Sequence, residues 1–122
     1  MKLHLSIPQA RNTFTAYGAG YVMVNGARHD TNLIVLPDRI LAWSVASFES
    51  LAAEDFDGLA RLDLEVVLLG TGAMLRFPRP QIVRALAEAK IGLEVMDVQA
   101  ACRTYNILAA EERRVAAALL LR

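Results

Sequence analysis

Residues 92–120, GLEVMDVQAACRTYNILAAEERRVAAALL, decide the fold class of this chain. GLEVM is typical of a short strand, and DVQAACRTYNILAAE is typical of a helix that Asp97 caps. The apolar side of that helix is expected to consist of Val98, Ala101, Cys102, Tyr105 and Leu108. RVAAALLL contains good helix formers, but it is apolar enough for a strand buried on both faces. Because a strand and a helix precede it, we expect a strand here.

The preceding segments repeat this order of elements. LEVVLLG, residues 64–70, is an almost unbroken β-branched and leucine run, as in a strand covered on both faces. RPQIVRALAEAKIG, residues 79–92, predicts a helix with Pro80 at its first position and Gly92 after its end. Alternating strands and helices imply right-handed crossovers and parallel strands, so the fold class is α/β.

The first half of the chain is predicted to contain shorter elements. GYVMVNGARHDTNLIVL, residues 20–36, predicts an antiparallel hairpin around Asn25 and Gly26. RILAWSV then predicts a strand with Trp43 in the core. FESLAAEDFDGL, residues 48–59, predicts one or two short helices that stop near Gly58. Its acidic side chains are interpreted as a solvated face, because no paired geometry for acid–base chemistry is visible.

Composition limits the classes of function. The 122 residues are 55% hydrophobic and carry thirteen basic and thirteen acidic side chains, so general nucleic-acid binding is disfavoured. Cys102 is the single cysteine, and His4 and His29 lie far from it, which argues against a zinc site. No window reaches the roughly 18 apolar residues of a membrane span. We expect a cytoplasmic protein without a transmembrane segment, a metal or a cofactor.

The segment at residues 92–120 resembles the family that includes mitochondrial complex I assembly factor 3, whose bacterial and archaeal members are mostly domains of unknown function. The resemblance is carried by GLEVM, AACRTYNIL, the glutamate–arginine pair before the alanine–leucine run, and the earlier GTG. Weaker matches reach back through Trp43 and the Asn25–Gly26 turn to AYGAGY. Two positions depart from the family, which usually has threonine at Val98 and glycine at Glu112. A positive φ at Glu112 would strain a glutamate.

The chain length predicts a single domain over residues 1–122, with residues 1–15 expected to be loosely ordered, and the resemblance implies that this domain has three layers. Its mostly parallel central sheet is flanked by helices, and an N-terminal antiparallel hairpin extends or covers that sheet. The resemblance also implies a non-catalytic, assembly-factor-like role with protein partners, in a pathway that assembles a membrane complex. It supplies no catalytic residue, the question of an enzyme stays open with a preference for none, and a homo-oligomer stays open as well.

The stretch LLGTGAMLRFPRP, residues 68–80, carries the alternative function. Gly70, Thr71 and Gly72 follow a strand, where α/β folds bind ligands, and their amides would face an anion with Arg76 or Arg79. The stretch matches neither the P-loop nor the dinucleotide fingerprint, so it is also typical of a plain turn. A small-molecule or anion site is predicted to form a pocket bounded by Thr71, Arg76 and Arg103.

Two groups on the last helix complete the candidates. Arg103 and Asn106 lie three residues apart and share a helix side, either as a recognition edge or as partners of neighbouring loops. Cys102 faces the sheet in the predicted helix and has no visible base, so it is interpreted as a small buried hydrophobic residue.

Overall fold

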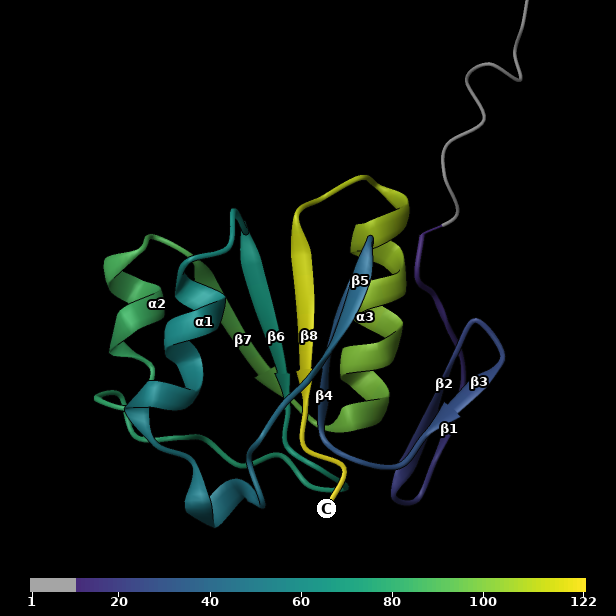
Figure 1. Cartoon of the computed structure of the whole chain (residues 1–122), viewed down its shortest axis with the longest axis horizontal. Coiled ribbons are helices and arrows are strands. Elements are labelled where there is room, and N and C mark those ends of the chain that lie inside the picture. Colours follow the sequence, from purple (N-terminus) through teal and green to yellow (C-terminus); the bar gives the residue numbers. More distant parts are fainter. Residues whose placement is uncertain (1–10) are drawn as a thin grey trace, which may run out of the picture.

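The strands form two separate sheets in the computed structural model, which describes residues 11–122 (Figure 1). The larger sheet has the strand order β5-β4-β8-β6-β7, and the smaller has the order β1-β2-β3. The strands are β1 (Phe14–Gly18), β2 (Tyr21–Val24), β3 (Ala27–His29), β4 (Leu33–Leu36), β5 (Arg39–Ala42), β6 (Val66–Gly70), β7 (Gly92–Met96) and β8 (Val115–Leu119). The helices are α1 (Asp57–Ala60), α2 (Arg84–Glu88) and α3 (Val98–Ala110), with short 3-10 turns η2 (Phe48–Ser50) and η3 (Ala53–Phe56). The chain is thus a mixed α/β domain.

The final apolar run is a strand, as predicted, and it lies in the middle of the larger sheet. β8 pairs in parallel with β6 and antiparallel with β4, and all five of its residues are buried. β6 also pairs in parallel with β7, whereas β4 and β5 are antiparallel. The sheet is therefore mixed rather than mostly parallel, because the β4–β5 hairpin supplies two of its five strands.

Both faces of the larger sheet are covered, and alternate residues of β8 enter two different cores. Val115, Ala117 and Leu119 pack with α3 and the smaller sheet. Ala116 and Ala118 pack with the segments around α1 and α2. Figure 1 shows α1 and α2 on one side of the sheet, with α3 and β1–β3 on the other. No helix within residues 11–122 has the length and apolar character needed to cross a bilayer.

The hairpin predicted over residues 20–36 is confirmed only around the Asn25–Gly26 turn, in the smaller sheet, because Leu33–Leu36 forms β4 of the larger sheet. β2 and β3 are antiparallel around Asn25 and Gly26, whose φ angles of 53° and 83° are those that a tight two-residue turn requires. β1 adds to β2, so the N-terminal strands pack against α3 without extending the larger sheet. Most of the segment expected to be loosely ordered, residues 1–15, lies outside the described residues, and β1 begins at Phe14.

The helix predicted over residues 79–92 is much shorter in the structure. Only Arg84–Glu88 is α-helical, and the preceding residues form turns in which Pro80 O accepts from Val83 N. Pro80 also disfavours the helical conformation of the residue before it. Lys90, with φ of 60°, reverses the chain, and Gly92 already belongs to β7. The prediction of Pro80 as the first helical position is therefore wrong.

The helix predicted after Asp97 is confirmed as α3. The Asp97 carboxylate accepts a hydrogen bond from Ala100 N at 2.9 Å, as an N-cap does. The predicted apolar side is buried except at Leu108, which is half-buried, and Ala109 is buried beside it. Glu112 follows with φ of 62°, so it takes the left-handed conformation in which glutamate is strained.

The remaining short elements agree in part with expectation. Trp43 is a core residue that packs edge-on against Phe56 and donates its indole N–H to Asp55 O. Residues 48–60 form short helical turns, as expected. Gly58 lies inside α1 and does not end it, because the chain continues through Ala60.

We predict that Gly70→Ala lowers the free energy of unfolding by about 1–3 kcal/mol, which is typical of overpacking a core. An added Cβ would lie 2.8 Å from Leu119 Cδ2 and 3.3 Å from Ala101 Cβ, between β8 and α3. The matched control is Gly58→Ala, where a Cβ meets no atom within 4 Å and alanine favours the helix. Urea denaturation should show a lower midpoint only for Gly70→Ala, and equal midpoints for the two variants would contradict this packing.

Candidate functional site

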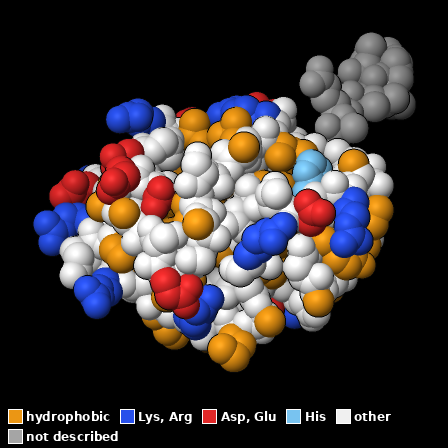
Figure 2. All heavy atoms as spheres, turned by 60° about the horizontal axis from the view of Figure 1, so that its bottom comes forward, with side chains coloured by type: hydrophobic (Ala, Val, Ile, Leu, Met, Phe, Trp, Pro, Cys, Tyr) orange, Lys and Arg blue, Asp and Glu red, His pale blue; other side chains and the backbone are white. Residues whose placement is uncertain are grey.

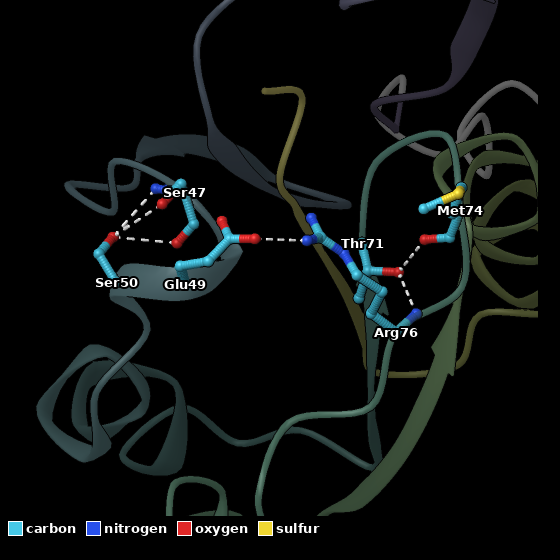
Figure 3. Close-up of polar contacts among 6 residues, drawn as sticks. All are labelled: Ser47, Glu49, Ser50, Thr71, Met74 and Arg76. Atoms are coloured by element: carbon cyan, nitrogen blue, oxygen red, sulfur yellow. Dashed lines mark hydrogen bonds and ion pairs between the residues drawn. The ribbon is translucent and has the colours of Figure 1, made fainter.

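The glycine–threonine–glycine stretch forms a turn that Thr71 ties together. Gly70 ends β6 at the carboxyl edge of the parallel strands, as predicted, and Gly72 has a φ of 87°. The buried Thr71 hydroxyl donates to Met74 O at 2.7 Å and accepts from Arg76 N at 3.0 Å, as Figure 3 shows. One side chain therefore fixes the course of the next five residues.

Several backbone groups of this turn bond to neighbouring elements. Thr71 N donates to Met96 O, and Gly70 O accepts from Leu120 N, each at 2.9 Å. Gly72 O accepts from Val98 N, which is the first amide of α3. An anion site needs amides that point at the ligand, but the amides of Thr71 and Val98 already have partners. The turn thus joins β6, β7, β8 and α3.

The Arg76 side chain contacts two residues of η2. Its guanidinium forms an ion pair of 2.6 Å with Glu49 and lies 4.4 Å from the centre of the Phe48 ring. Figure 3 shows the arginine reaching from the Thr71 turn to η2. The pKa of the Glu49 carboxyl is lowered, first by its own backbone amide and then by Arg76. Arg76 is thus the partner of the exposed Glu49 carboxylate on η2 instead of a cation that faces the glycine turn.

Arg79 lies with Arg76 along a cavity of about 440 Å³. The other lining side chains are mostly apolar and come from η2 and the loop after β6: Phe48, Glu49, Leu51, Phe77, Pro78 and Ile82. Arg79 forms no ion pair with any residue between 11 and 122. Arg76 and Arg79 are thus brought together, but beside η2.

Arg103 and Asn106 lie on α3 and face the smaller sheet. Asn106 makes two bonds of 2.9 Å to β1, because it accepts from Phe14 N and donates to Phe14 O. Arg103 donates to the Tyr17 hydroxyl at 3.5 Å, which raises the pKa of the guanidinium. The two bonds agree with the interpretation of Asn106 as a partner of a neighbouring segment.

The seven candidate residues therefore lie in three places. Gly70, Thr71 and Gly72 form the turn, Arg76 and Arg79 line the η2 cavity, and Arg103 and Asn106 hold the smaller sheet. A second cavity of about 350 Å³ borders Gly72, but Arg76 and Arg103 are not among its lining residues. The anion site stays a prediction.

The other reactive groups agree with structural roles. Burial raises the pKa of the Cys102 thiol to about 12, so the nucleophilic thiolate is disfavoured. Within residues 11–122, no three His, Cys, Asp or Glu side chains lie close enough to hold a metal ion. A third cavity, of about 340 Å³, is lined by Arg11, Asp38, Arg39, Asp63, Glu112, Arg113 and Arg114, and each of these arginines pairs with a carboxylate.

The loop after β6 exposes apolar side chains that were not predicted from the sequence. Met74, Leu75 and Phe77 are 67%, 50% and 71% exposed. The sequence signal for them is AMLRFPRP, where apolar residues are interspersed with arginines and prolines.

We predict that Thr71→Val lowers the free energy of unfolding by about 1–3 kcal/mol, since the part-buried Met74 O and Arg76 N both lose their hydrogen bond to the Thr71 hydroxyl. Thr71→Ser keeps the hydroxyl and is expected to lose less than half as much. Thermal denaturation of the two variants measures the difference, and equal losses would contradict a hydrogen-bonding role.

Comparisons with known proteins agree on one family. The family model described as "Protein of unknown function (DUF498/DUF598)" matches residues 14–120. Bovine NADH dehydrogenase [ubiquinone] 1 alpha subcomplex assembly factor 3 is 33% identical over 107 residues, which are 86% of this chain and 58% of the relative. The chain thus spans little more than half the length of that relative.

Bacterial relatives cover more of their own length. The 13 kDa major membrane protein of Francisella tularensis is 26% identical over 92% of this chain and 93% of its own. A crystal structure of a Bordetella parapertussis protein is 42% identical, with a TM-score of 0.86 over 92% of this chain and 97% of the other. The resemblance stated from residues 92–120 is confirmed, and the chain belongs to the DUF498/DUF598 family.

Proposed function

We propose that the chain is an assembly-factor-like domain that acts by binding other proteins without catalysing a reaction. The observation that carries the proposal is the identity of 33% with bovine assembly factor 3 over 86% of this chain. Because the match covers only 58% of that relative, the protein partner of this chain and the step of assembly at which it acts are also proposals. The proposed partners are proteins on the assembly pathway of a respiratory NADH dehydrogenase, met at the cytoplasmic side of the membrane.

The fold supports this proposal because packed cores on both faces of the larger sheet hold its loops in place. In a three-layer arrangement, helices cover the faces of the sheet and leave loops at the carboxyl ends of the parallel strands to meet partners. Here that edge carries the Thr71 turn and the loop of exposed apolar residues that follows it. Exposed apolar side chains that lie together on a surface often mark an interaction site.

Tagged protein, crosslinked in cells of the source organism and purified, is expected to carry NADH dehydrogenase subunits well above the level in untagged cells. Deletion of the gene is expected to lower the amount of assembled dehydrogenase, measured on native gels and as NADH oxidation by isolated membranes. ATP synthase on the same gels is the control. Normal dehydrogenase in the deleted strain, together with no enrichment of its subunits, would contradict the proposal.

The anion-binding alternative has a separate test. We predict that millimolar phosphate leaves the melting temperature unchanged, because Thr71 N and Arg76 already have partners. Differential scanning fluorimetry measures this. A rise in melting temperature that disappears in Arg76→Ala and Arg79→Ala would support the anion site instead.

A further inference from the structure

The cavity beside η2 opens over the hydrophobic core on the α1 and α2 side of the larger sheet. Its volume is about 440 Å³, and Phe48, Leu51 and Ile82 are among its lining residues. Leu51 is buried in that core, whereas Phe48 and Ile82 are partly buried and pack against it. Pockets of about 300–1,000 Å³ hold whole small molecules, so this cavity has room for a large apolar side chain.

The charges along the cavity do not balance. The charged side chains that line it are Glu49, Arg76 and Arg79. Glu49 forms its ion pair with Arg76, and the exposed Arg79 forms none with any residue from 11 to 122. Within the same residues, the buried Nε of Arg76 has no hydrogen-bond partner. The cavity therefore combines apolar walls with one uncompensated cation, a combination that favours a ligand with an apolar part and a negative charge beside it.

The two walls of the cavity are already joined in the absence of a ligand. The Arg76 guanidinium lies 2.6 Å from the Glu49 carboxylate and 4.4 Å from the centre of the Phe48 ring, and both residues belong to η2. The backbone of Arg76 is bonded to the Thr71 hydroxyl, so the loop after β6 is held against η2, as Figure 3 shows. A pre-ordered cavity loses less conformational entropy on binding than a mobile one.

The surroundings of the cavity favour a protein segment over a small molecule. Phe77 lines the cavity and is 71% exposed, and Met74 and Leu75 of the same loop are exposed as well. Figure 2 shows the molecule with the carboxyl ends of β6, β7 and β8 turned forward, and apolar side chains lie there in small groups between charged ones. Protein interfaces of this kind depend on a few apolar anchors in pockets, with polar contacts around them.

We propose that the cavity beside η2 takes a large apolar side chain of a protein partner, and that Arg79 pairs with a carboxylate close to that side chain in the partner's sequence. The segment that binds is thus an acidic peptide with an apolar anchor such as leucine or phenylalanine. The inference rests on the proposed function for its claim that the ligand is a protein, and it adds the chemistry of the segment and the residues that receive it.

Selection of peptides tests the proposal. Random peptides displayed on phage are selected on the immobilised full chain, and the enriched peptides are synthesised and titrated by fluorescence anisotropy. The enriched sequences are expected to share a large apolar residue with an aspartate or glutamate nearby, and salt should weaken their binding. Enrichment without acidic residues would overturn the proposal, and so would a failure to enrich any peptide above the bare support.

Variants of the full chain locate the binding. Arg79→Glu is expected to weaken the selected peptides at least about tenfold, because like charges then meet, and to favour peptides in which lysine replaces the acidic residue. Ile82→Trp fills the cavity from its wall and is expected to weaken them about tenfold as well.

The matched control is Arg28→Glu. It reverses an exposed charge on β3, on the other side of the larger sheet, and should leave peptide binding unchanged. Melting temperatures confirm that each variant is folded. Equal affinities of the unchanged chain and Arg79→Glu would overturn the proposal, even if Ile82→Trp does not fold.

Capture from crosslinked cells separates this inference from the proposed function. Dehydrogenase subunits that the unchanged chain captures, and that Arg79→Glu loses, would support both. Subunits captured equally by the two would support the proposed function and overturn the cavity as the binding site. Selected acidic peptides that bind in the cavity, without any captured subunits, would support the inference and contradict the dehydrogenase as the source of the partner.

Discussion

The fold depends on the insertion of β8 between β4 and β6. Its five residues are fully buried, and its backbone pairs with a parallel neighbour on one side and an antiparallel neighbour on the other. β8 is the strand that joins the β4–β5 hairpin to the β6–β7 pair, because it lies between β4 and β6. Three consecutive alanines at 116–118 keep the strand thin, so the layers on both faces pack close to it. The larger sheet is therefore completed by residues near the end of the sequence, through contacts that are distant along the chain.

Buried polar side chains then fasten the remaining segments to this sheet. Asn32 donates to Val45 O and accepts from Leu121 N, so it links the entry to β4, the segment after β5 and the residues that follow β8. Tyr105 donates to Asn12 O and packs edge-on against Phe14. With the paired bonds of Asn106 to β1, these contacts hold the smaller sheet on α3. Each bond satisfies backbone groups that burial would otherwise leave unpaired.

Sequence predicted the elements whose signals are local. The Asn25–Gly26 turn and the Asp97 cap are each set by a few neighbouring residues, and β8 followed from the order of elements against its own helix propensity. The helix at residues 79–92 was overestimated, because helix propensity ignores the turns that Pro80 begins. Local sequence does not show whether β4 pairs in parallel or antiparallel, because its partner β8 lies far away along the chain. The site was predicted least well: Arg76 and Glu49 lie 27 positions apart, and no local pattern reveals their ion pair.

The glycine–threonine–glycine stretch is explained by this architecture without a ligand. Gly70 gives α3 and β8 room to approach, Thr71 sets the course of the loop, and Gly72 takes a positive φ that a larger residue would adopt with strain. The turn is bonded to β7, to the residues after β8 and to α3, so it has little freedom to close around an anion. It holds the residues that follow it in one conformation. Pre-ordered apolar side chains lose less conformational entropy on contact than a mobile loop would. The stretch thus supports the loop that follows it, and the anion site stays a prediction.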